Sequence, residues 1–313
     1  MDSAVPVILF AYTRIDLLMR TLDCLRADQV PLIYAFSDGP KTPADTENVN
    51  RVRQILRKID WCDLHLVERD QNYGLGKSIM DGVTQILEKH ETAIIFEDDL
   101  VCVPGTYKYL CAALERYKDD KSVMSVTGWA HPLTTPSDVV DQPYFDGRTE
   151  CYVWGTWRRA WEGMDRDALS LMEECERRGI DIYRYGADLV KMAKMEKIKN
   201  LWAVRFSYLH ILNQGLCLRP PYSIVKHLGI GEESANVKSF AGYKWYVDLP
   251  RACPPIPEVW PSARENLECP VLWQKECGIR PKQTAAPIDG KYFRWFMDVK
   301  LFFKKIIKTL RRK

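Results

Sequence analysis

Short apolar runs and amphipathic segments follow one another in a regular order over the first third of the chain. Four runs have the length and hydrophobic content of buried strands: residues 5–12, 31–39, 62–70 and 92–100. The segments between them carry apolar side chains at helical spacing: residues 14–26, 49–59 and 74–89. Because strands that alternate with helices form a parallel sheet through right-handed crossovers, we predict an α/β fold for this part.

The second half of the chain has a less regular pattern. It begins with a strand candidate at residues 122–131. A loop rich in Pro, Ser and Asp follows at 134–150, and an aromatic run at 151–161. We then predict a helical stretch at residues 167–199, interrupted near Gly179. A second helix is predicted at 202–215, and a strand with a turn at 216–231. Residues 249–290 hold many prolines and few periodic stretches, so we expect an irregular wrapping or linker segment there.

Composition and cysteine usage narrow the class of protein. Of the 313 residues, 46% are hydrophobic and 28% are charged, which is typical of a globular protein and excludes a disordered or collagen-like chain. The ten cysteines are scattered and none forms a C-x-x-C pair, so a structural zinc site is not expected. Scattered thiols and a start without a secretory leader favour a reducing cytosol.

The basic charge of the chain is concentrated in residues 291–313. This segment holds nine Lys/Arg and one Asp, so it carries +8 while the remainder carries −5. The overall charge of +3 is therefore no reason to expect a nucleic-acid partner.

We predict an amphipathic helix for the same segment, 291–313. On a helical projection one face is apolar and aromatic: Tyr292, Phe296, Val299, Phe303, Ile306, Ile307 and Leu310. The opposite face is basic: Arg294, Lys304, Lys305, Lys308 and Arg312. This pattern is typical of a helix that lies in an anionic membrane surface, and it is too polar to span a bilayer. The alternative is a terminal helix packed on the body with its charges in solvent.

Three acidic residues, Glu97, Asp98 and Asp99, directly follow the fourth apolar run. In a parallel α/β sheet, ligands bind at the carboxyl ends of the strands, where this triplet would lie. Neighbouring side chains of a strand point to opposite sides, so we expect one or two of these carboxylates to hold Mn²⁺ or Mg²⁺ and another to meet a sugar or ribose. Such an ion would act as a Lewis acid on a leaving diphosphate. The alternative is an exposed acidic turn.

Three further polar residues follow strand candidates or open a helix. Asp38 ends the second strand candidate, where it would accept hydrogen bonds from a base or ribose, or cap a turn with the following Gly-Pro. Arg14 lies just past the first strand, and its alternative is a solvated helix N-terminus. Lys77 lies in the glycine-bearing stretch 72–78, where a helix N-terminus and a cation together favour an anion. The glycine spacing matches neither the Walker nor the dinucleotide-binding motif.

Four segments carry a resemblance to a known family: VPVILFAYTRIDLLMRTLDCL, FSDGP, VERDQNYGLGKSIMDGV and IIFEDDLVCVPGTYKYL. The chain resembles the GT-A glycosyltransferases of the family 2 type and is similar to N-acetylglucosaminyltransferase I. The likeness continues through YFDGRTECYVWGTWRRAW and LCLRPPYSIVKHLGIG and covers residues 5–240. It implies a GT-A (Rossmann-like), mostly parallel sheet flanked by helices, an irregular acceptor-side half, and transfer from a nucleotide sugar with inversion.

The resemblance also implies roles for the candidate residues. It places a donor site around Arg14, Asp38, Lys77, Glu97 and Asp98. The first two match positions that hold the ribose and base, Lys77 lies near the diphosphate, and the two acidic residues lie around the donor sugar and ribose. Asp99 matches the aspartate that binds the metal directly.

One departure from the family concerns the catalytic base. In the relatives a catalytic aspartate commonly follows a tryptophan that here matches Trp202, but Ala203 follows it. Because the attacking hydroxyl must lose its proton, the base is either elsewhere or absent. Glu150 and Asp165 are the candidates. The alternative for Glu150 is an exposed loop glutamate, and the alternative for Asp165 is an aspartate that caps a helix.

A second departure concerns the metal. Relatives often place a metal-binding histidine at the turn near Asn236, which would here replace it. The nearest histidine, His227, lies earlier in the turn, and we interpret it as structural.

Four tryptophans cluster in the second half: Trp129, Trp154, Trp157 and Trp161. An aromatic face suits the C–H face of a sugar, and core packing is the alternative. For Trp157 and Trp161, spaced i and i+4, we expect core packing. Trp154, beside Gly155, is the acceptor-side candidate.

The sequence thus predicts a metal-dependent glycosyltransferase of hexosyl or N-acetylhexosaminyl type, acting in polysaccharide biosynthesis on a glycan or lipid-linked acceptor. We expect it in the cytoplasm at the inner face of the cell membrane. One alternative is a catalytically silent sugar-nucleotide or glycan-binding protein. Another is a nucleotidyltransferase, which would normally need a glycine-rich basic loop after the first strand. We divide the chain into a nucleotide-sugar-binding half at 1–125 and an acceptor-side half at 126–248. The wrapping segment at 249–290 and the amphipathic helix at 291–313 follow.

Overall fold

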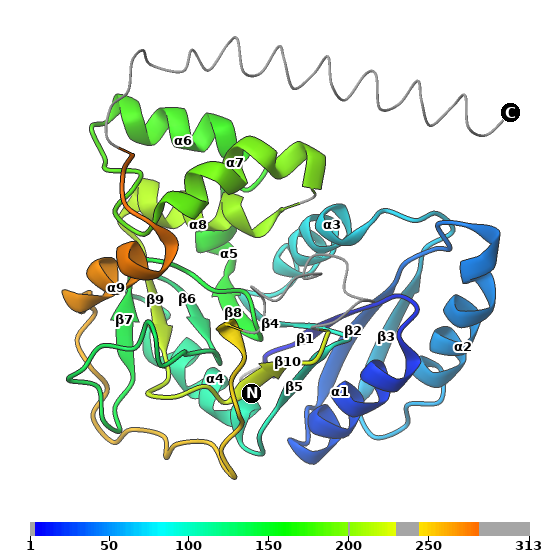
Figure 1. Cartoon of the computed structure of the whole chain (residues 1–313). Helices are drawn as coiled ribbons and strands as arrows, with labels where there is room; N and C mark the ends of the chain where they lie inside the picture. The colour runs from blue at the N-terminus through cyan, green and yellow to red at the C-terminus, as the bar shows by residue number, and fades with distance from the viewer. Residues whose placement is uncertain (1–3, 200, 230–243, 282–313) are drawn as a thin grey trace, which may run out of the picture.

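The structure has an α/β fold around one large, mostly parallel sheet. It is a computed structural model that describes residues 4–199, 201–229 and 244–281. The strands are β1 (Val7–Ala11), β2 (Leu32–Ser37), β3 (Asp63–Glu68), β4 (Thr92–Glu97), β5 (Leu100–Cys102), β6 (Val123–Thr127), β7 (Tyr144–Asp146), β8 (Trp154–Trp157), β9 (Leu216–Arg219) and β10 (Val225–His227). Within the described residues, eight of them form a sheet in the order β3-β2-β1-β4-β8-β6-β9-β7, and β5 pairs with β10 (Figure 1).

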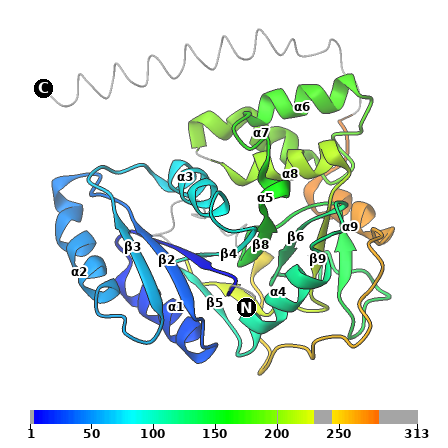
Figure 2. The ribbon, with the colours of Figure 1, turned by 180° about the vertical axis from the view of Figure 1, so that it is seen from behind.

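Helices flank this sheet, which confirms the predicted fold class. They are α1 (Ile15–Ala27), η1 (Pro43–Asp45), α2 (Thr46–Leu56), α3 (Leu75–Leu87), α4 (Thr106–Arg116), α5 (Arg158–Trp161), α6 (Ala168–Arg177), α7 (Ala187–Lys199), α8 (Ala203–Asn213) and α9 (Glu268–Cys277). Figure 2 shows from behind that α6, α7 and α8 gather over one end of the sheet, and α1, α2 and α3 lie at the other.

The first half follows the predicted alternation of strands and helices closely. The central strand β1 pairs in parallel with β2 and β4, and every residue of β1 is buried, as its uninterrupted apolar run requires. The edge strand β3 instead alternates exposed and half-buried positions, because its successive side chains point to opposite faces and Leu64 and Leu66 pack against the core. The carboxyl ends of β1, β2 and β4 therefore meet at one edge of the sheet.

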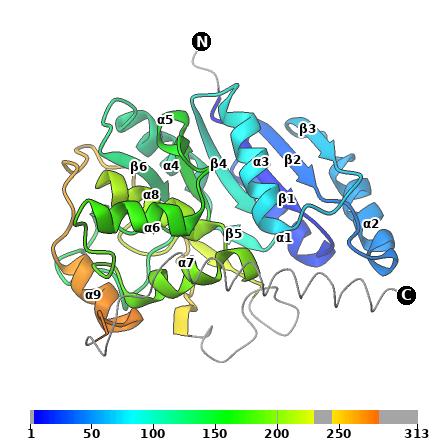
Figure 3. The same ribbon diagram turned by 90° about the horizontal axis from the view of Figure 1, so that it is seen from above.

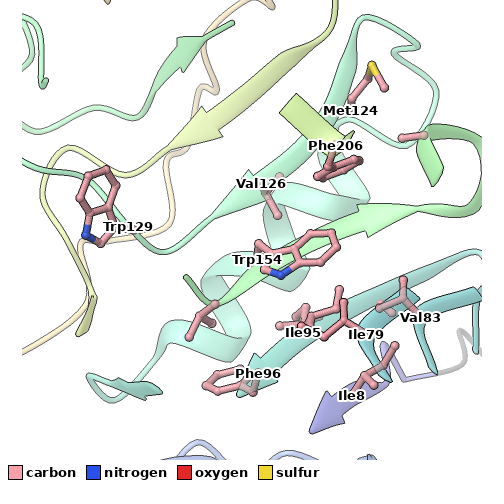
Figure 4. Packing of buried hydrophobic residues seen from close by; sticks show 14 of the residues in the cluster. Ile8, Ile79, Val83, Ile95, Phe96, Met124, Val126, Trp129, Trp154 and Phe206 are labelled. Atoms are coloured by element: carbon pink, nitrogen blue, oxygen red, sulfur yellow. The ribbon is translucent and has the colours of Figure 1, made fainter. Parts of the chain in front are cut away.

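The second half extends the sheet with mixed directions. β8 runs antiparallel to both β4 and β6, β9 is parallel to β6, and β7 is antiparallel to β9 at the far edge. Trp154 of β8 is buried in the core between Ile95 and Val126, as Figure 4 shows. Its ring also lies 5.1 Å from that of Phe206.

Several elements differ from the expectation. The predicted loop 134–150 contains β7, and the predicted irregular segment 249–290 contains α9, whose Trp273 is buried in the core. We did not predict β5 or α4. The strands β5 and β7 have three residues each and depend on distant partner strands, so local periodicity carries no signal for them.

A buried ion pair holds the second half together. The Arg219 guanidinium lies 2.8 Å from Asp146, and both side chains are fully buried. Trp273 of α9 donates from Nε1 to the same carboxylate at 2.8 Å, and the backbone N–H of Arg148 donates to it at 2.9 Å. Arg219 in turn donates to the carbonyl oxygen of Arg148 at 2.8 Å. The cluster joins β7, β9 and α9 to the start of the loop that precedes β8.

Two predictions lie outside the described residues. These are the metal-ligand question at Asn236 and the amphipathic helix at 291–313. Among the helices that the structure does describe, none is long and apolar enough to cross a membrane.

Candidate functional site

A cavity of about 240 Å³ opens at the carboxyl ends of β1 and β4. Its first side is polar and comes from the α/β half and β10: Arg14, Glu97, Asp99 and His227. Its second side comes from the loop before β8: Arg148, Thr149, Glu150, Cys151 and Tyr152. Residues of α3, α7 and α8 and the turn before α8 complete the wall: Leu75, Leu189, Met192, Leu201, Trp202, Ala203 and Ser207. Figure 3, seen from above, shows α3 and α7 over neighbouring parts of the sheet.

The turn after β4 explains how the acidic triplet reaches this cavity. β4 ends at Glu97, and the chain then enters β5, which pairs antiparallel with β10 so that His227 is opposite Leu100. The backbone N–H of Leu228 donates to the carbonyl oxygen of Asp99 at 2.8 Å. This pairing brings His227 to Asp99, with Nε2 3.0 Å from the carboxylate oxygen Oδ2.

The three acidic side chains are divided between two environments. Glu97 and Asp99 line the cavity, whereas Asp98 between them is buried and accepts a hydrogen bond from the backbone N–H of Tyr12 at 3.0 Å. Arg14 bridges the two aspartates, with 2.5 Å to Asp98 and 2.6 Å to Asp99. Two carboxylates of the triplet therefore face the cavity, and the third holds the β1–α1 turn.

Burial and charge act differently on these three carboxyl groups. Burial, reinforced by repulsion from Asp99 and Asp98, raises the pKa of Glu97 to about 8. Burial also outweighs Arg14 at Asp98 and raises its pKa to about 6. At Asp99 burial is outweighed by the hydrogen bonds and charges of His227 and Arg14, so its pKa lies below the usual value. Asp99 is thus the carboxyl group of the triplet whose surroundings stabilise its ionised form.

The surroundings of Asp99 fit a divalent cation. Its Oδ1 oxygen is buried and has no hydrogen-bond partner among the described residues, and neither has Nδ1 of His227. A Cβ atom at Gly229 would lie 2.3 Å from Oδ2 of Asp99, so a side chain there would fill the space beside the carboxylate. In the described ranges no group of three or more His, Cys, Asp or Glu could hold a metal alone. A cation here would need additional oxygens, such as those of a diphosphate.

Asp38 and Lys77 lie outside the cavity wall. The Asp38 carboxylate accepts hydrogen bonds from the backbone N–H groups of Tyr73 and Gly74, both at 2.9 Å, and thereby fixes the start of α3. The Gly-Pro turn, which was the alternative for Asp38, contributes one further hydrogen bond from the backbone N–H of Gly39 at 3.2 Å, and a role of Asp38 toward a base or ribose stays a prediction. Lys77 is exposed, with its Nζ 4.1 Å from the centre of the Tyr73 ring.

The two candidate bases have opposite placements. Glu150 lines the cavity, and burial raises the pKa of its carboxyl group although Arg148 and Arg219 partly offset this effect. Its Oε1 lies 3.9 Å from Nε of Arg148. Asp165 is exposed in the turn before α6 and does not line the cavity.

The aromatic assignments also change. Trp154 is 1% exposed and packs in the core, so it is not available to stack on an acceptor. Trp202, before α8, lines the cavity instead, and Ala203 follows it in the wall. Between Tyr152 in the wall and Trp154 in the core, Val153 adopts a left-handed backbone with φ 46°, which is rare for a β-branched residue. This bend separates the cavity-lining loop from β8.

Several residues of the cavity wall were not recognised from the sequence, or were given a different role there. We interpreted His227 as structural, and Arg148, Thr149 and Tyr152 were not singled out. A histidine in the segment after the apolar strand β9 is a weak signal, and its proximity to Asp99 depends on the β5–β10 pairing. Arg148 forms a two-pronged ion pair with Asp188 of α7, at 2.9 and 2.8 Å, which the sequence does not reveal.

Comparisons with known proteins yield distant similarities to solved structures. No protein-family model and no curated protein matches the sequence. The mannosyltransferase PcManGT from Pyrobaculum calidifontis, solved with GDP-Man and Mn²⁺, aligns with a TM-score of 0.34 and 18% identity over 56% of this chain and 46% of its own. S. aureus TarS 1-349 in complex with UDP aligns with a TM-score of 0.42 and 13% identity, over 71% of this chain and 60% of its own. The chain thus spans less than two thirds of either structure, and these similarities are too distant to assign an activity.

Proposed function

We propose that the protein transfers a sugar from a nucleoside-diphosphate sugar to a hydroxyl group of a glycan or lipid-linked acceptor, with inversion as the family resemblance implies. The observation that carries this proposal is the cavity at the carboxyl ends of β1 and β4. On one side it has an ionised carboxylate, Asp99, with an unpartnered oxygen, and on the other a second carboxylate, Glu150, of raised pKa. One side suits a metal-bound diphosphate and the other suits proton removal.

Asp99 and His227 are the residues that would hold Mn²⁺ or Mg²⁺. When bound, the ion supplies Lewis-acid chemistry toward the leaving diphosphate. Arg14 keeps Asp98 and Asp99 in place and offsets their charge, since its guanidinium contacts both. Glu97 borders the same space and is the residue we assign to the donor sugar or ribose.

Release of nucleoside diphosphate is the direct test of this function. The protein is incubated with UDP-, GDP- and TDP-sugars and Mn²⁺ or Mg²⁺, with and without saccharide acceptors. We expect release that requires the cation and stops when a chelator is added. Donor binding without release on any acceptor would favour the silent binding protein, and formation of pyrophosphate would favour the nucleotidyltransferase.

A silent binding protein is favoured by one specific observation. Ala203 lies in the cavity wall after Trp202, at the position where the resemblance leads us to expect the catalytic aspartate. The proposal of an enzyme therefore depends on Glu150 as the base, because it is the remaining carboxylate of the loop-side wall.

Glu150→Gln is expected to lower the rate of transfer by about 10²–10⁴-fold, because the amide cannot take the proton of the attacking hydroxyl. The pKa of Glu150 is raised, and a base must be deprotonated to act. The native rate should therefore fall as the pH decreases through that raised pKa, and the fall should be absent in the variant. The measurement is a pH–rate profile for sugar transfer under saturating donor.

Asp165→Asn is the matched control for this change. Asp165 was the other candidate base but is exposed and outside the cavity, so its loss should leave the rate within about 2-fold of native. A Glu150→Gln protein with the native rate and pH profile would rule out this base.

The segment 291–313 is proposed to attach the enzyme to the cytoplasmic face of an anionic membrane. Deleting it should abolish sedimentation with vesicles that contain phosphatidylglycerol, since each basic residue near such a surface contributes about 1 kcal/mol. Replacing Lys304, Lys305 and Lys308 by glutamine should weaken binding to these vesicles and leave binding to neutral ones unchanged. Vesicle binding that is the same with and without the segment would contradict the proposal.

A further inference from the structure

A row of buried polar side chains leads from the core to the wall of the cavity. His210 of α8 and Ser125 of β6 are both fully buried, and their Nε2 and Oγ atoms lie 2.9 Å apart. Ser125 Oγ lies 3.0 Å from Oγ1 of Thr149, which is 3% exposed and belongs to the cavity-lining loop. At the inner end, Nδ1 of His210 lies 2.8 Å from the carbonyl oxygen of Phe206.

The directions of these hydrogen bonds follow from the inner end. A carbonyl oxygen can only accept, so Nδ1 of His210 carries the hydrogen. Burial lowers the pKa of His210 to about 4, so the ring is neutral and its Nε2 is an acceptor. Ser125 must then donate its single hydroxyl hydrogen to Nε2, since a buried acceptor without a donor is costly.

The hydroxyl of Thr149 is directed by the same reasoning. Because the hydrogen of Ser125 is committed to His210, Thr149 must donate to Ser125; otherwise two oxygens would lie 3.0 Å apart with no hydrogen between them. The adjacent Cys217 thiol donates weakly to the carbonyl oxygen of Leu218 at 3.8 Å and also lies within hydrogen-bond reach of Ser125. Sulfur is a weaker acceptor than the ring nitrogen of His210, so the hydrogen of Ser125 stays with Nε2. Thr149 Oγ1 is left with lone pairs and no hydrogen to offer a ligand.

We infer that Thr149 is a specificity-determining residue that accepts a hydrogen bond from a hydroxyl group of the saccharide acceptor. Thr149 precedes Glu150 in the same wall, so a hydroxyl held by Thr149 lies on the side of the cavity where the proposed base acts. Ser125 and His210 act through Thr149 as positioning residues. The identity of the ligand as a saccharide acceptor rests on the proposed function. The direction of the hydrogen bonds does not depend on that function.

The chemistry makes a distinct prediction about ligands. A site that offers only lone pairs binds a hydroxyl but not a fluorine or methoxy group at the same position, because neither can donate. We expect a native preference of about 10-fold or more for one hydroxyl over its fluorine substitute, in line with the loss of one hydrogen bond plus an unpaired buried acceptor.

The test uses methyl glycosides of the common hexoses and N-acetylhexosamines, together with their monodeoxyfluoro counterparts. Binding to the donor-loaded protein is measured by ligand-observed NMR. The native protein should prefer the hydroxyl at one ring position, Thr149→Ser should retain this preference, and Thr149→Val should lose it. Ser125→Ala should weaken it, because the freed Thr149 hydroxyl can then act as a donor as well as an acceptor.

A readout on the histidine ring separates this inference from the proposed function, because it needs neither a donor nor turnover. Nitrogen-15 NMR of the histidine rings should show His210 neutral with its hydrogen on Nδ1, and Ser125→Ala should shift the Nε2 resonance. Thermal unfolding of each variant shows whether it is folded.

The outcomes are distinct. A hydrogen on Nε2 of native His210, an unchanged preference in Thr149→Val, or no glycoside bound by native protein would each overturn the inference. If nucleotide sugars are not cleaved but the hydroxyl preference and its loss are observed, the proposed enzyme fails while the role of Thr149 in glycan binding stands.

Discussion

Asp99→Asn is expected to abolish cation-dependent release of nucleoside diphosphate, with a loss of about 10³-fold or more. The asparagine preserves the size of the side chain but removes the negative charge that faces the cavity. Since the Lewis-acid contribution of a cation amounts to several kcal/mol, losing the cation lowers the rate by orders of magnitude. The measurement is the initial rate of release from the nucleotide sugar that the native protein cleaves, over a titration of Mn²⁺.

Two comparisons make the Asp99 result specific. Asp165→Asn removes an exposed carboxylate and should leave the rate and the Mn²⁺ dependence unchanged. His227→Gln should raise the Mn²⁺ concentration needed for half-maximal rate, because its Nε2 lies 3.0 Å from the Asp99 carboxylate and would bind the same ion. An Asp99→Asn protein that retains more than a tenth of the native rate would show that this residue does not hold the cation.

Arg219→Met is expected to lower the free energy of unfolding by about 3–5 kcal/mol, because it leaves the Asp146 carboxylate buried without its cation. Both side chains are fully buried, and the pair joins β7 and β9. The free energy of unfolding is measured by urea denaturation, monitored by tryptophan fluorescence and circular dichroism. The double variant Asp146→Asn/Arg219→Met should be more stable than Arg219→Met alone, since it removes the uncompensated charge.

An exposed ion pair provides the matched control. Arg57 contacts Glu68 at 2.6 Å with 58% of its side chain exposed, so Arg57→Met should cost about 0–1 kcal/mol. Equal losses in the two arginine variants would show that burial does not determine the importance of Arg219. The difference between them measures the cost of leaving one charge of a buried pair alone.

The sequence predicted those features of the fold that are encoded locally. The apolar run ending at Phe96 and the acidic triplet after it are adjacent in the chain, so a strand followed by carboxylates at its end could be inferred directly. Asp98 and Asp99, however, lie in the turn after β4 and contact the same Arg14 guanidinium, so the alternation expected within a strand does not describe them. Helices such as α1 and α3 were recognised because their apolar residues recur at the helical period.

The parts of the site that escaped prediction depend on contacts between distant segments. His227 reaches Asp99 only because β10 pairs with β5, and a three-residue strand has no periodicity of its own. Trp154 was assigned to the acceptor side because tryptophan suits both a core and a sugar site. The crossing of β8 between β4 and β6, which the sequence does not show, buries it.

Helix α9 changes how the C-terminal part of the chain should evolve. A linker tolerates substitution nearly everywhere, but Trp273 donates to the buried Asp146 beside the loop that carries Thr149 and Glu150. Selection should therefore act on the two faces of α9 differently. Val271, which is exposed, is free to diverge among descendants, whereas Trp273 should change only together with Asp146 and Arg219. Insertions or deletions between α9 and β9 should be tolerated only if they preserve this contact.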